Sequence, residues 1–424
     1  MSRFSKALII VLALALIGIA ASVVSAVSVT HLTYVYHGDA FLRYLEEKAA
    51  EFKKLTNIDV EIIVGNQEKF KTMLAGGADP DIHDLPDFDY LAFSDYYVDI
   101  IPLLKRDGLL GQFNPGLIKA MSDQKGALHE VPQGIASVVG FFNRTMFLEA
   151  GVTPPDKLGS EYNWDAVLQL GKKLTRDVDG DGIPETFGVD RGYAYWRRAV
   201  AQAGGRFYEY DSNGQAIKSL WNTPEVEQGL SYVARLWEEG TIPWMRVARH
   251  DDYFFWTGKT GIDIVDATGI IGSYLSNVTW DWDMTLLPAG PKGPIASGAG
   301  GYGPNIMAST KHLNEAWEWC KFLFINRRNM EDMMALVGTV PALTSAQPAY
   351  AGIANLRDKN YQVIFDALNY LPPPEYGAVP QELSARSVNV NDVILGKIPA
   401  RQFLEQLHIQ KQAIVDDLQR SAKK

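Results

Sequence analysis

Hydrophobic and polar residues alternate with two different periods along the first part of the chain. Residues 32–36 and 58–62 alternate with the period of two that is typical of β-strands. Residues 41–52 and 67–74 carry apolar side chains at helical spacing, and residues 80–82 open a further strand. The order strand, helix, strand, helix, strand predicts a parallel sheet with helices on its faces.

The loops after the first and third of these predicted strands are rich in polar and aromatic residues. Residues 36–39 end the first strand, and residues 84–90 end the third. In an open parallel sheet, ligands bind beyond the carboxyl ends of the strands. We therefore expect both loops to line the mouth of a ligand-binding crevice.

A second patterned region covers residues 138–285. Residues 224–239 have helical periodicity, and residues 262–265 form a compact apolar strand. A Gly/Pro-rich stretch follows at residues 288–294, and patterned structure resumes after it. We interpret this stretch as a crossover of the chain between two lobes.

The first 26 residues have the order of a secretory signal peptide. Arg3 and Lys6 precede an apolar run over residues 7–20, and small residues then lead to Ala26. We therefore expect residues 1–26 to be removed and the protein to be secreted, to the periplasm or to the cell surface. An uncleaved membrane anchor is the alternative, although the apolar run is short for a membrane span.

Length, charge and cysteine content narrow the class of protein. The remainder of the 424-residue chain is long enough to predict two hydrophobic cores. The net charge is −10 and basic clusters are lacking, which argues against a nucleic-acid partner. Cys320 is the only cysteine, so a disulfide within the chain is excluded, and its apolar neighbours at helical spacing predict a buried thiol. We expect a monomer.

Two short motifs resemble nucleotide-binding loops but lack the required context. Residues 298–303 have the spacing G-x-G-x-x-G, yet Pro304 stands where a helix should begin. Residues 258–260 resemble the end of a phosphate loop, but Tyr253 occupies the place of its first glycine. The seven histidines show no metalloenzyme spacing. We therefore expect a protein that is not an enzyme and requires no cofactor.

An Asp/Gly-rich segment matches the first half of a calcium-binding loop. Alternate residues of such a loop point carboxylates inward, which suits a hard cation that takes several oxygen ligands. The twelfth position, where a bidentate Glu is usual, is Gly188, and Glu185 is the candidate to compensate. The alternative is a surface turn without metal. The candidate ligands for a structural Ca2+ ion are Asp177, Asp179, Asp181, Ile183 and Glu185.

Aromatic residues are abundant, with 10 Trp, 19 Tyr and 18 Phe. Most must lie in the core, but sugars also stack their C–H patches on aromatic faces and bond their hydroxyl groups to carboxylates, amides and guanidinium groups. The candidates for ligand contact are therefore aromatic residues in predicted loops beside polar groups. They are Tyr36 with His37 and Asp39, Tyr90 with Asp87 and Asp89, Trp196, Trp256 and Tyr302.

A series of short motifs, taken in order, resembles the extracellular solute-binding proteins of ABC importers, the large group that includes maltose-binding protein. Each motif alone is weak, but their order and spacing along nearly the whole chain are specific. The motifs are Gly76-Gly-Ala-Asp-Pro-Asp-Ile82, Val131-Pro-Gln-Gly134, Phe141-Phe-Asn-Arg-Thr-Met-Phe147, Ala150-Gly-Val-Thr-Pro-Pro155, Thr257-Gly-Lys-Thr-Gly261, Gly300-Gly-Tyr-Gly303 and Gly338-Thr-Val-Pro-Ala342.

The resemblance implies two α/β lobes with a ligand cleft between them and closure by hinge bending. By that pattern the N-terminal lobe holds residues 29–136 and 290–342, and the C-terminal lobe holds residues 137–289 and 343–424. The family's frequent cleft tryptophan is missing near residues 266–269. The ligand contacts that the resemblance implies include Tyr36, His37, Gly38, Asp39, Asn66, Asp87, Asp89, Tyr90, Ser137, Trp196, Asp266, Thr268, Gly301, Tyr302 and Glu382.

These observations predict the substrate-binding component of an ABC importer, which captures a mono- or oligosaccharide and delivers it to a membrane permease. One alternative is a secreted carbohydrate-active enzyme, which is also acidic and lined with aromatic residues. Another is a binder of the same fold for a polyamine, a peptide or a polyol phosphate. Phosphate is disfavoured, because the candidate loops offer mainly Asp and aromatic side chains rather than Arg and Lys.

Overall fold

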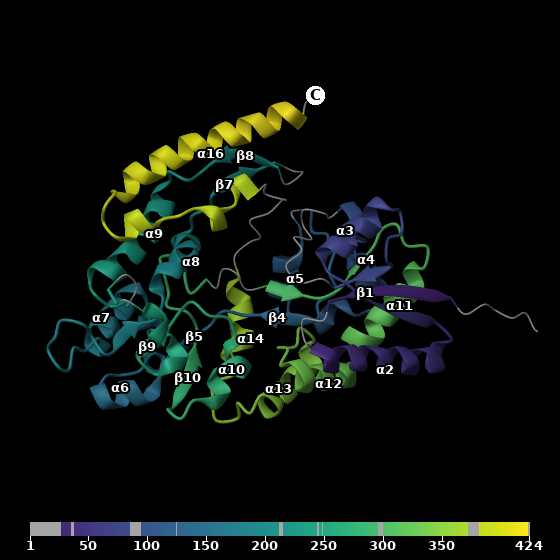
Figure 1. Cartoon of the computed structure of the whole chain (residues 1–424), viewed down its shortest axis with the longest axis horizontal. Helices are drawn as coiled ribbons and strands as arrows, with labels where there is room; N and C mark the ends of the chain where they lie inside the picture. The colour runs from purple at the N-terminus through teal and green to yellow at the C-terminus, as the bar shows by residue number, and fades with distance from the viewer. Residues whose placement is uncertain are drawn as a thin grey trace, which may run out of the picture.

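The protein has two lobes. Figure 1 shows two groups of elements side by side, one with the N-terminal strand of the chain and the other with the long C-terminal helix. Among the described residues, no helix has both the length and the apolar character needed to cross a membrane. The computed structural model describes residues 27–34, 38–84, 95–123, 125–211, 215–243, 246–247, 249–295, 300–371 and 381–422.

The first lobe is built on a four-stranded sheet with the strand order β12-β3-β1-β2. β1, β2 and β3 run parallel, and β12 runs antiparallel to β3. The predicted parallel sheet is confirmed, although β1 ends at Thr33 rather than at residue 36. The strands and connecting helices are β1 (Ser28–Thr33), α2 (Gly38–Thr56), β2 (Asp59–Val64), α3 (Gln67–Ala75), β3 (Ile82–His83) and β12 (Asn305–Ile306).

One face of α2 packs in the core of this lobe. Phe41, Leu45, Ala49 and Phe52 are all buried, which confirms the apolar face that their spacing predicts. The ring of Phe52 lies 5.3 Å, between centroids, from the ring of Trp319 in α11 (Leu313–Phe324). The Cys320 thiol is buried on the same face of α11 as Trp319, as predicted.

The second lobe is built on a sheet with the order β10-β5-β9-β6. β6 and β9 run parallel, whereas β5 runs antiparallel to both β9 and β10. β6 lies so close to α7 that a Cβ atom at Gly188 would stand 2.2 Å from the backbone of Gly171. The elements of this region are β5 (Gly140–Asn143), α6 (Arg144–Ala150), α7 (Trp164–Leu174), β6 (Phe187–Val189), α8 (Trp196–Ala203), α9 (Pro224–Glu238), β9 (Thr260–Asp263) and β10 (Trp282–Thr285).

A small two-stranded sheet joins the two lobes. β4 (Gly134–Ala136) pairs antiparallel with β11 (Gly300–Tyr302), and in Figure 1 β4 lies between the two groups of elements. β4 continues into β5 of the second sheet, and the chain returns from β10 toward β11. The Gly/Pro-rich stretch at residues 288–294 lies between β10 and β11 along the chain, and its role as a crossover between the lobes stays a prediction.

The remaining elements cover the two sheets and close the chain. The helices are α4 (Ile101–Arg106), α5 (Pro115–Met121), α10 (Ile270–Ser273), α12 (Arg327–Val337), α13 (Gln347–Ile353), α14 (Val363–Asp366), α15 (Asn391–Ile394) and α16 (Ala400–Ala422). A hairpin of β7 (Tyr208–Tyr210) and β8 (Ala216–Ser219) lies beneath α16 (Figure 1). The short 3-10 helices used below are η7 (His250–Tyr253), η8 (Phe255–Thr257) and η12 (Gln381–Leu383).

Two large hydrophobic clusters form the cores. The first contains Trp317 and Trp319, and the second contains Trp196 and Trp221. Apolar residues of the segment 343–368 pack with the first cluster, whereas those from Leu383 onward pack with the second. The predicted lobe boundary at residue 343 places both of these segments in the second lobe. The positions of the lobe boundaries stay a prediction.

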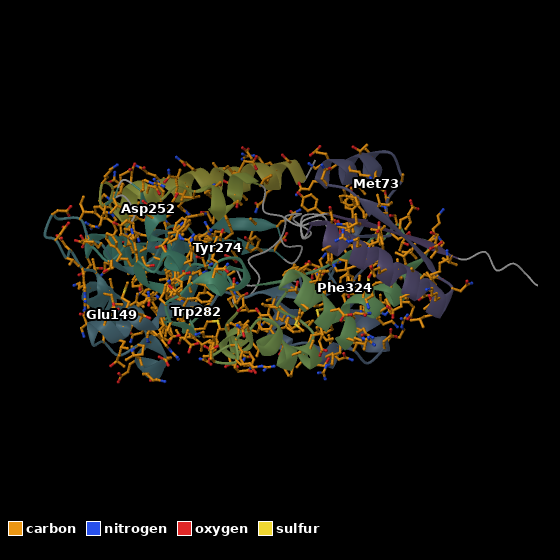
Figure 2. The ribbon with its side chains drawn as sticks, turned by 60° about the horizontal axis from the view of Figure 1, so that its bottom comes forward. Met73, Glu149, Asp252, Tyr274, Trp282 and Phe324 are labelled. Carbon is orange, nitrogen blue, oxygen red and sulfur yellow. The ribbon has the colours of Figure 1, made fainter. Side chains whose placement is uncertain are left out.

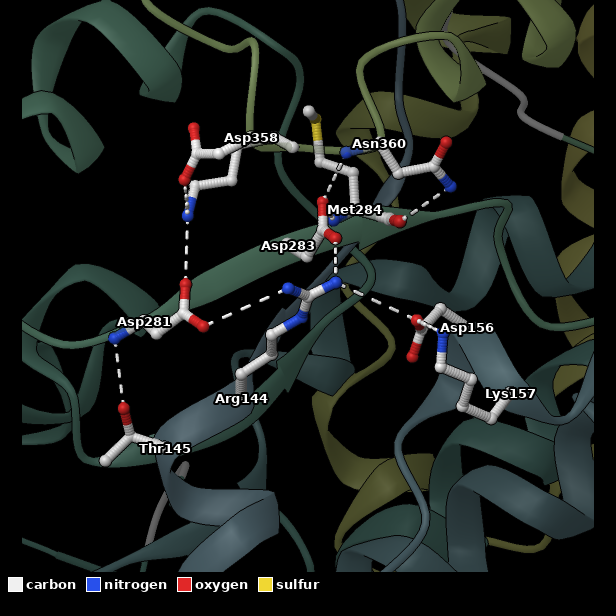
Figure 3. A network of polar contacts seen from close by, with 10 residues as sticks. Arg144, Thr145, Asp156, Lys157, Asp281, Asp283, Met284, Asp358 and Asn360 are labelled. Atoms are coloured by element: carbon white, nitrogen blue, oxygen red, sulfur yellow. Dashed lines mark hydrogen bonds and ion pairs between the residues drawn. The ribbon is translucent and has the colours of Figure 1, made fainter.

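A polar network ties the segment before α14 to the second sheet (Figure 3). Asp283 of β10 is buried and accepts hydrogen bonds from the guanidinium group of Arg144 and from the backbone N–H of Asn360, the latter at 2.6 Å. The carboxylate of Asp281 lies at the edge of this network, where it pairs with Lys359 at 2.9 Å. The network thus joins α6, β10 and residues 358–360.

Replacement of Asp283 by Ala should destabilise the protein by about 3 kcal/mol, because the partly exposed guanidinium group of Arg144 and the backbone N–H of Asn360 both lose a buried carboxylate as their acceptor. The matched control is Asp281→Ala, since the Asp281 side chain is 53% exposed and its ion pairs should contribute less than about 1 kcal/mol. Chemical unfolding of the two variants measures both values. Equal losses of stability in the two variants would contradict the assignment.

Candidate functional site

Two fully buried carboxylates mark the carboxyl ends of neighbouring strands in the second sheet. Asp190 directly follows β6, and Asp263 is the last residue of β9. Because β6 and β9 are parallel, both residues lie at the same edge of the sheet. That edge also meets the connection between the lobes, where the bridge of Val138 with Ala267 forms. This is the position at which open α/β sheets bind ligands.

Arg191 and Asp266 complete a charged cluster with these two residues. The guanidinium group of Arg191 pairs with the carboxylates of Asp190, at 3.2 Å, and of Asp266. One oxygen of Asp263 accepts the backbone N–H groups of Val265, at 2.7 Å, and of Asp266. Asp263 therefore shapes the turn that carries Asp266, while Asp266 and Arg191 are each 17% exposed.

Aromatic side chains form a wall beside the charged cluster. The guanidinium carbon of Arg191 lies 4.4 Å from the ring centre of Phe254 and 5.3 Å from that of Trp256. Trp256 in η8 stacks on Tyr274, with ring centres 4.2 Å apart and an interplanar angle of 11°. The carboxylate of Asp190 holds this segment by accepting the backbone N–H of Phe255 at 2.9 Å.

The outer member of this wall is open to solvent. Tyr274 is 47% exposed, and in Figure 2 it lies closer to the middle of the molecule than Asp252. A guanidinium group, carboxylates and a stacked aromatic pair therefore meet at one edge of the second sheet. This arrangement can offer both polar and stacking contacts to a ligand.

Burial changes the electrostatics of the cluster. Burial and the neighbouring Asp266 and Asp190 raise the pKa of Asp263 well above its ordinary value. Its Oδ2 atom is buried and has no hydrogen-bond partner among the described residues. Burial therefore opposes ionisation of Asp263, while the backbone N–H groups on its Oδ1 atom and the nearby Arg191 favour it.

Polar residues also gather at the carboxyl edge of the first sheet. Asp84 follows β3 and accepts a hydrogen bond from the Thr33 hydroxyl at 3.1 Å, and its carboxylate lies 3.4 Å from the ring nitrogen Nε2 of His31. Buried Glu130 accepts the backbone N–H of Gly303, which directly follows β11. The two sheets thus each present polar groups at the ends of their parallel strands.

Comparison with known proteins agrees with this architecture. Residues 38–325, more than half of the chain, match the family of bacterial extracellular solute-binding proteins. The chain belongs to this family. A search of curated proteins finds no match.

Solved structures share the two-lobed fold of this solute-binding protein. The sugar-binding protein MalE of Xanthomonas citri has a TM-score of 0.74 and 17% identity, with 94% of this chain and 99% of that chain covered. UspC of M. tuberculosis has a TM-score of 0.72 and 20% identity, with coverages of 91% and 100%. The cyclic alpha-maltosyl-1,6-maltose binding protein of Arthrobacter globiformis has a TM-score of 0.72 and 18% identity, with coverages of 93% and 100%.

The structure brings several predicted ligand contacts of the solute-binding protein together. Trp256 and Asp266 meet at Arg191, as described above. Thr268 donates its backbone N–H to the carbonyl of Ser137 at 2.9 Å, so both lie where the lobes connect. The Ser137 hydroxyl is buried and donates to the carbonyl of Ile364 at 3.2 Å. Ser137 and Thr268 therefore build the connection between the lobes in this structure.

Other predicted contacts lie on the first lobe or in β11. Asp39 is exposed in the first turn of α2, which begins at Gly38. Exposed Asn66 caps α3, and its side chain accepts the N–H of Lys69 at 2.9 Å. Gly301 pairs with β4, and the neighbouring Tyr302 is 36% exposed. Tyr36, His37, Asp87, Asp89 and Tyr90 lie outside the described residues, as do residues 1–26, which we predict to be a signal peptide.

Two predicted ligand contacts, Trp196 and Glu382, have described surroundings other than the charged cluster. Trp196 is only 4% exposed and packs against Phe207 and Trp221, so in this structure its ring is part of the second core. Glu382 lies in η12, where its backbone carbonyl accepts a hydrogen bond from Lys411 of α16. Neither residue shares a described contact with the charged cluster. The apolar face of α8, which begins at Trp196, explains the burial of its ring.

Sequence reasoning missed Asp190, Arg191, Asp263 and Tyr274 as members of the site. A signal for the first two was present, because they follow the apolar run Phe187–Val189 directly. Asp263 was assigned to the interior of the strand 262–265, whereas β9 ends at this residue. Tyr274 had no local signal, since only the fold stacks it on Trp256.

The Asp/Gly-rich loop brings three of its predicted ligands together. Carboxylate oxygens of Asp177, Asp179 and Glu185 lie within 4.8 Å of one another, and the role of Glu185 as a calcium ligand stays a prediction. Asp181 is not part of this group, and its carboxylate accepts the backbone N–H of Ile183 at 2.7 Å. The group is exposed at Asp177 and Asp179, which limits the affinity of any ion held there.

Glu130 should make the stability of the solute-binding protein depend on pH. Burial raises the pKa of Glu130 from 4.5 to about 8, so the folded protein keeps a proton that the unfolded chain loses. The stability contributed by Glu130 should therefore fall as the pH rises from about 4.5 to about 8, by up to about 1.4 kcal/mol per pH unit.

Glu130→Gln should remove this decline, because the amide cannot ionise. Unfolding free energies of the wild type and the variant between pH 5 and pH 9 measure the effect as a changing difference. Glu46→Gln, at an exposed position of α2, serves as the control and should leave a constant difference. A constant difference for Glu130→Gln as well would refute the buried protonated carboxyl group.

Proposed function

We propose that this solute-binding protein captures a carbohydrate, a mono- or oligosaccharide, between its two lobes and delivers it to the permease of an ABC importer. The observation that carries the proposal is the stacked pair of Trp256 and Tyr274 beside the ion pair of Arg191 and Asp266. Sugar rings present C–H faces to aromatic rings and hydroxyl groups to planar polar side chains. Both kinds of partner are within one small region here.

Several proteins with the same fold support the sugar as ligand. The solved structures include a maltodextrin-binding MalE domain of Bdellovibrio bacteriovorus bound to maltotriose and a Listeria monocytogenes protein in complex with cycloalternan. Another similar structure, from Agrobacterium radiobacter, holds ribitol. Their ligands are all rich in hydroxyl groups, which is the chemistry that the charged cluster and the aromatic wall suit.

Binding without turnover fits the described carboxylates better than glycoside hydrolysis. A glycosidase needs one carboxyl group as acid and a second as nucleophile or base at the scissile bond. In the charged cluster, Asp190 is engaged by Arg191 and by the backbone of Phe255, and Asp263 is fully buried. We therefore propose a binding protein rather than an enzyme. Release of product from oligosaccharides would contradict this.

Export and assembly complete the proposal. We propose that residues 1–26 direct the chain out of the cytoplasm, in keeping with its extracellular solute-binding family. The protein would then work as a monomer in the periplasm or at the cell surface, where it meets the permease. Hinge bending at the connection of β4 and β11 would close the two lobes around the sugar.

Loss of the aromatic wall should weaken sugar binding. Trp256→Ala removes one stacked ring and should raise the dissociation constant about tenfold, which corresponds to about 1.4 kcal/mol. Isothermal titration calorimetry with a panel of mono- and oligosaccharides measures this. The matched control is Trp237→Ala in α9, where Trp237 also faces an arginine, Arg246, at 4.7 Å. Equal affinity of wild type and Trp256→Ala for every sugar that binds would contradict the proposed site.

A structural Ca2+ ion is the second part of the proposal, with no cofactor required for capture itself. We expect Asp177, Asp179 and Glu185 to hold Ca2+ with a dissociation constant of roughly 1 mM, because the site is open and short of ligands. At about 10 mM Ca2+ this stabilises the folded protein by about 1.4 kcal/mol, which should raise the melting temperature by a few degrees.

Differential scanning calorimetry with Ca2+ and with Mg2+ tests the ion, since Mg2+ demands a more regular octahedral site. Asp179→Asn should abolish the shift produced by Ca2+. Asp165→Asn, which removes an exposed carboxylate of α7, is the control and should retain the shift. An equal shift in Asp179→Asn, or no shift in the wild type, would remove Ca2+ from the proposal.

A further inference from the structure

The positive charge of Arg191 is already neutralised at the proposed sugar site. Its guanidinium group pairs with both Asp190 and Asp266, and the nitrogen Nη2 donates to a carboxylate oxygen of each residue. The guanidinium carbon also lies over the rings of Phe254 and Trp256, at 4.4 and 5.3 Å from their centres. The partners that the structure describes for the Arg191 guanidinium group are therefore carboxylates and aromatic rings.

The two carboxylates that hold Arg191 have different tasks. Asp190 is fully buried and also accepts the backbone N–H of Phe255, so it supports the aromatic wall as well as the arginine. Asp266 is partly exposed and receives Arg191 on the turn that Asp263 shapes. Asp266 is thus the partner that a ligand at this edge would meet together with the guanidinium group.

We propose that Asp266 is a specificity-determining residue that keeps Arg191 neutralised and so restricts the site to uncharged sugars. This inference rests on the proposed capture of a carbohydrate. A sugar with a carboxylate or phosphate group would have to approach the Asp266 carboxylate or displace it from Arg191. Either step costs electrostatic energy, because the two like charges would share a poorly solvated region. A neutral sugar can bond to both partners without separating them.

Because the aromatic wall also holds Arg191, loss of the Asp266 carboxylate alone should convert the site into one that accepts acidic sugars. Without the Asp266 carboxylate, Arg191 would still be held by Asp190 and by the faces of Phe254 and Trp256. Its guanidinium group would then lack one of its two carboxylate partners. It could therefore form a bidentate bond to a ligand carboxylate. Asp266→Asn should therefore admit acidic sugars.

The test compares neutral sugars with their uronic acids, in which a carboxylate replaces the C6 hydroxymethyl group. Titration calorimetry measures binding of glucose with glucuronic acid, and of any oligosaccharide that binds with its uronic acid counterpart, to the wild type and to Asp266→Asn. The wild type should bind the neutral sugar at least tenfold more tightly than the acid. In Asp266→Asn this preference should shrink by at least tenfold, and added salt should weaken the gained binding of the acid.

The control variant is Asp252→Asn, which removes the same charge from η7 but from a residue that pairs with Arg249 rather than with Arg191. It should keep the preference of the wild type. Circular dichroism checks folding, and Asp266→Ser, smaller and also uncharged, replaces the amide variant if that variant does not fold.

The outcomes distinguish a failure of this inference from a failure of the proposed sugar capture. A wild type that binds uronic acids as tightly as neutral sugars overturns the role of Asp266 and leaves sugar capture intact. An unchanged preference in Asp266→Asn does the same. If neither the wild type nor the variants bind any sugar, neutral or acidic, then the proposed function fails and the inference falls with it.

Discussion

The buried carboxylates at the ends of β6 and β9 impose a constraint that shapes everything around them. Asp190 and Asp263 are fully buried, and a buried charge must find partners or bind a proton. Asp190 finds Arg191 and the backbone of Phe255, while Asp263 shapes the turn before Asp266 and holds a raised pKa. The aromatic wall and the charged cluster thus occupy their places because these two groups must be satisfied.

The same edge of the sheet is where the lobes connect. Ser137 and Thr268 bond to each other through the backbone, directly beside the turn of Asp266. The hydroxyl of Ser137 in turn reaches Ile364, next to the segment that the Asp283 network anchors to β10. The connection between the lobes and the candidate site therefore share backbone segments. A ligand held by the charged cluster would lie beside the segments at which we propose that the lobes bend.

The fold follows largely from local patterns. The apolar face of α2 and the alternation around β2 could be read from the sequence, because spacing of 3.6 and of 2 residues reports which side of an element is buried. The order of these elements also predicts the parallel sheet, and the sheet confirms it. The ends of the strands were predicted less accurately, since β9 ends two residues before the end of the predicted strand.

The candidate site shows where local patterns stop. The sequence by itself determined two α/β lobes, the solute-binding family and the presence of polar and aromatic loops, since these depend on periodicity and on the order of motifs. Only the tertiary structure decided that Trp196 lies in a core, that Tyr274 stacks on Trp256 and that Arg191 pairs with both Asp190 and Asp266. The physical reason is distance along the chain. These partners are separated by up to 75 residues, and only the pairing of β6 with β9 brings the ends of their strands together.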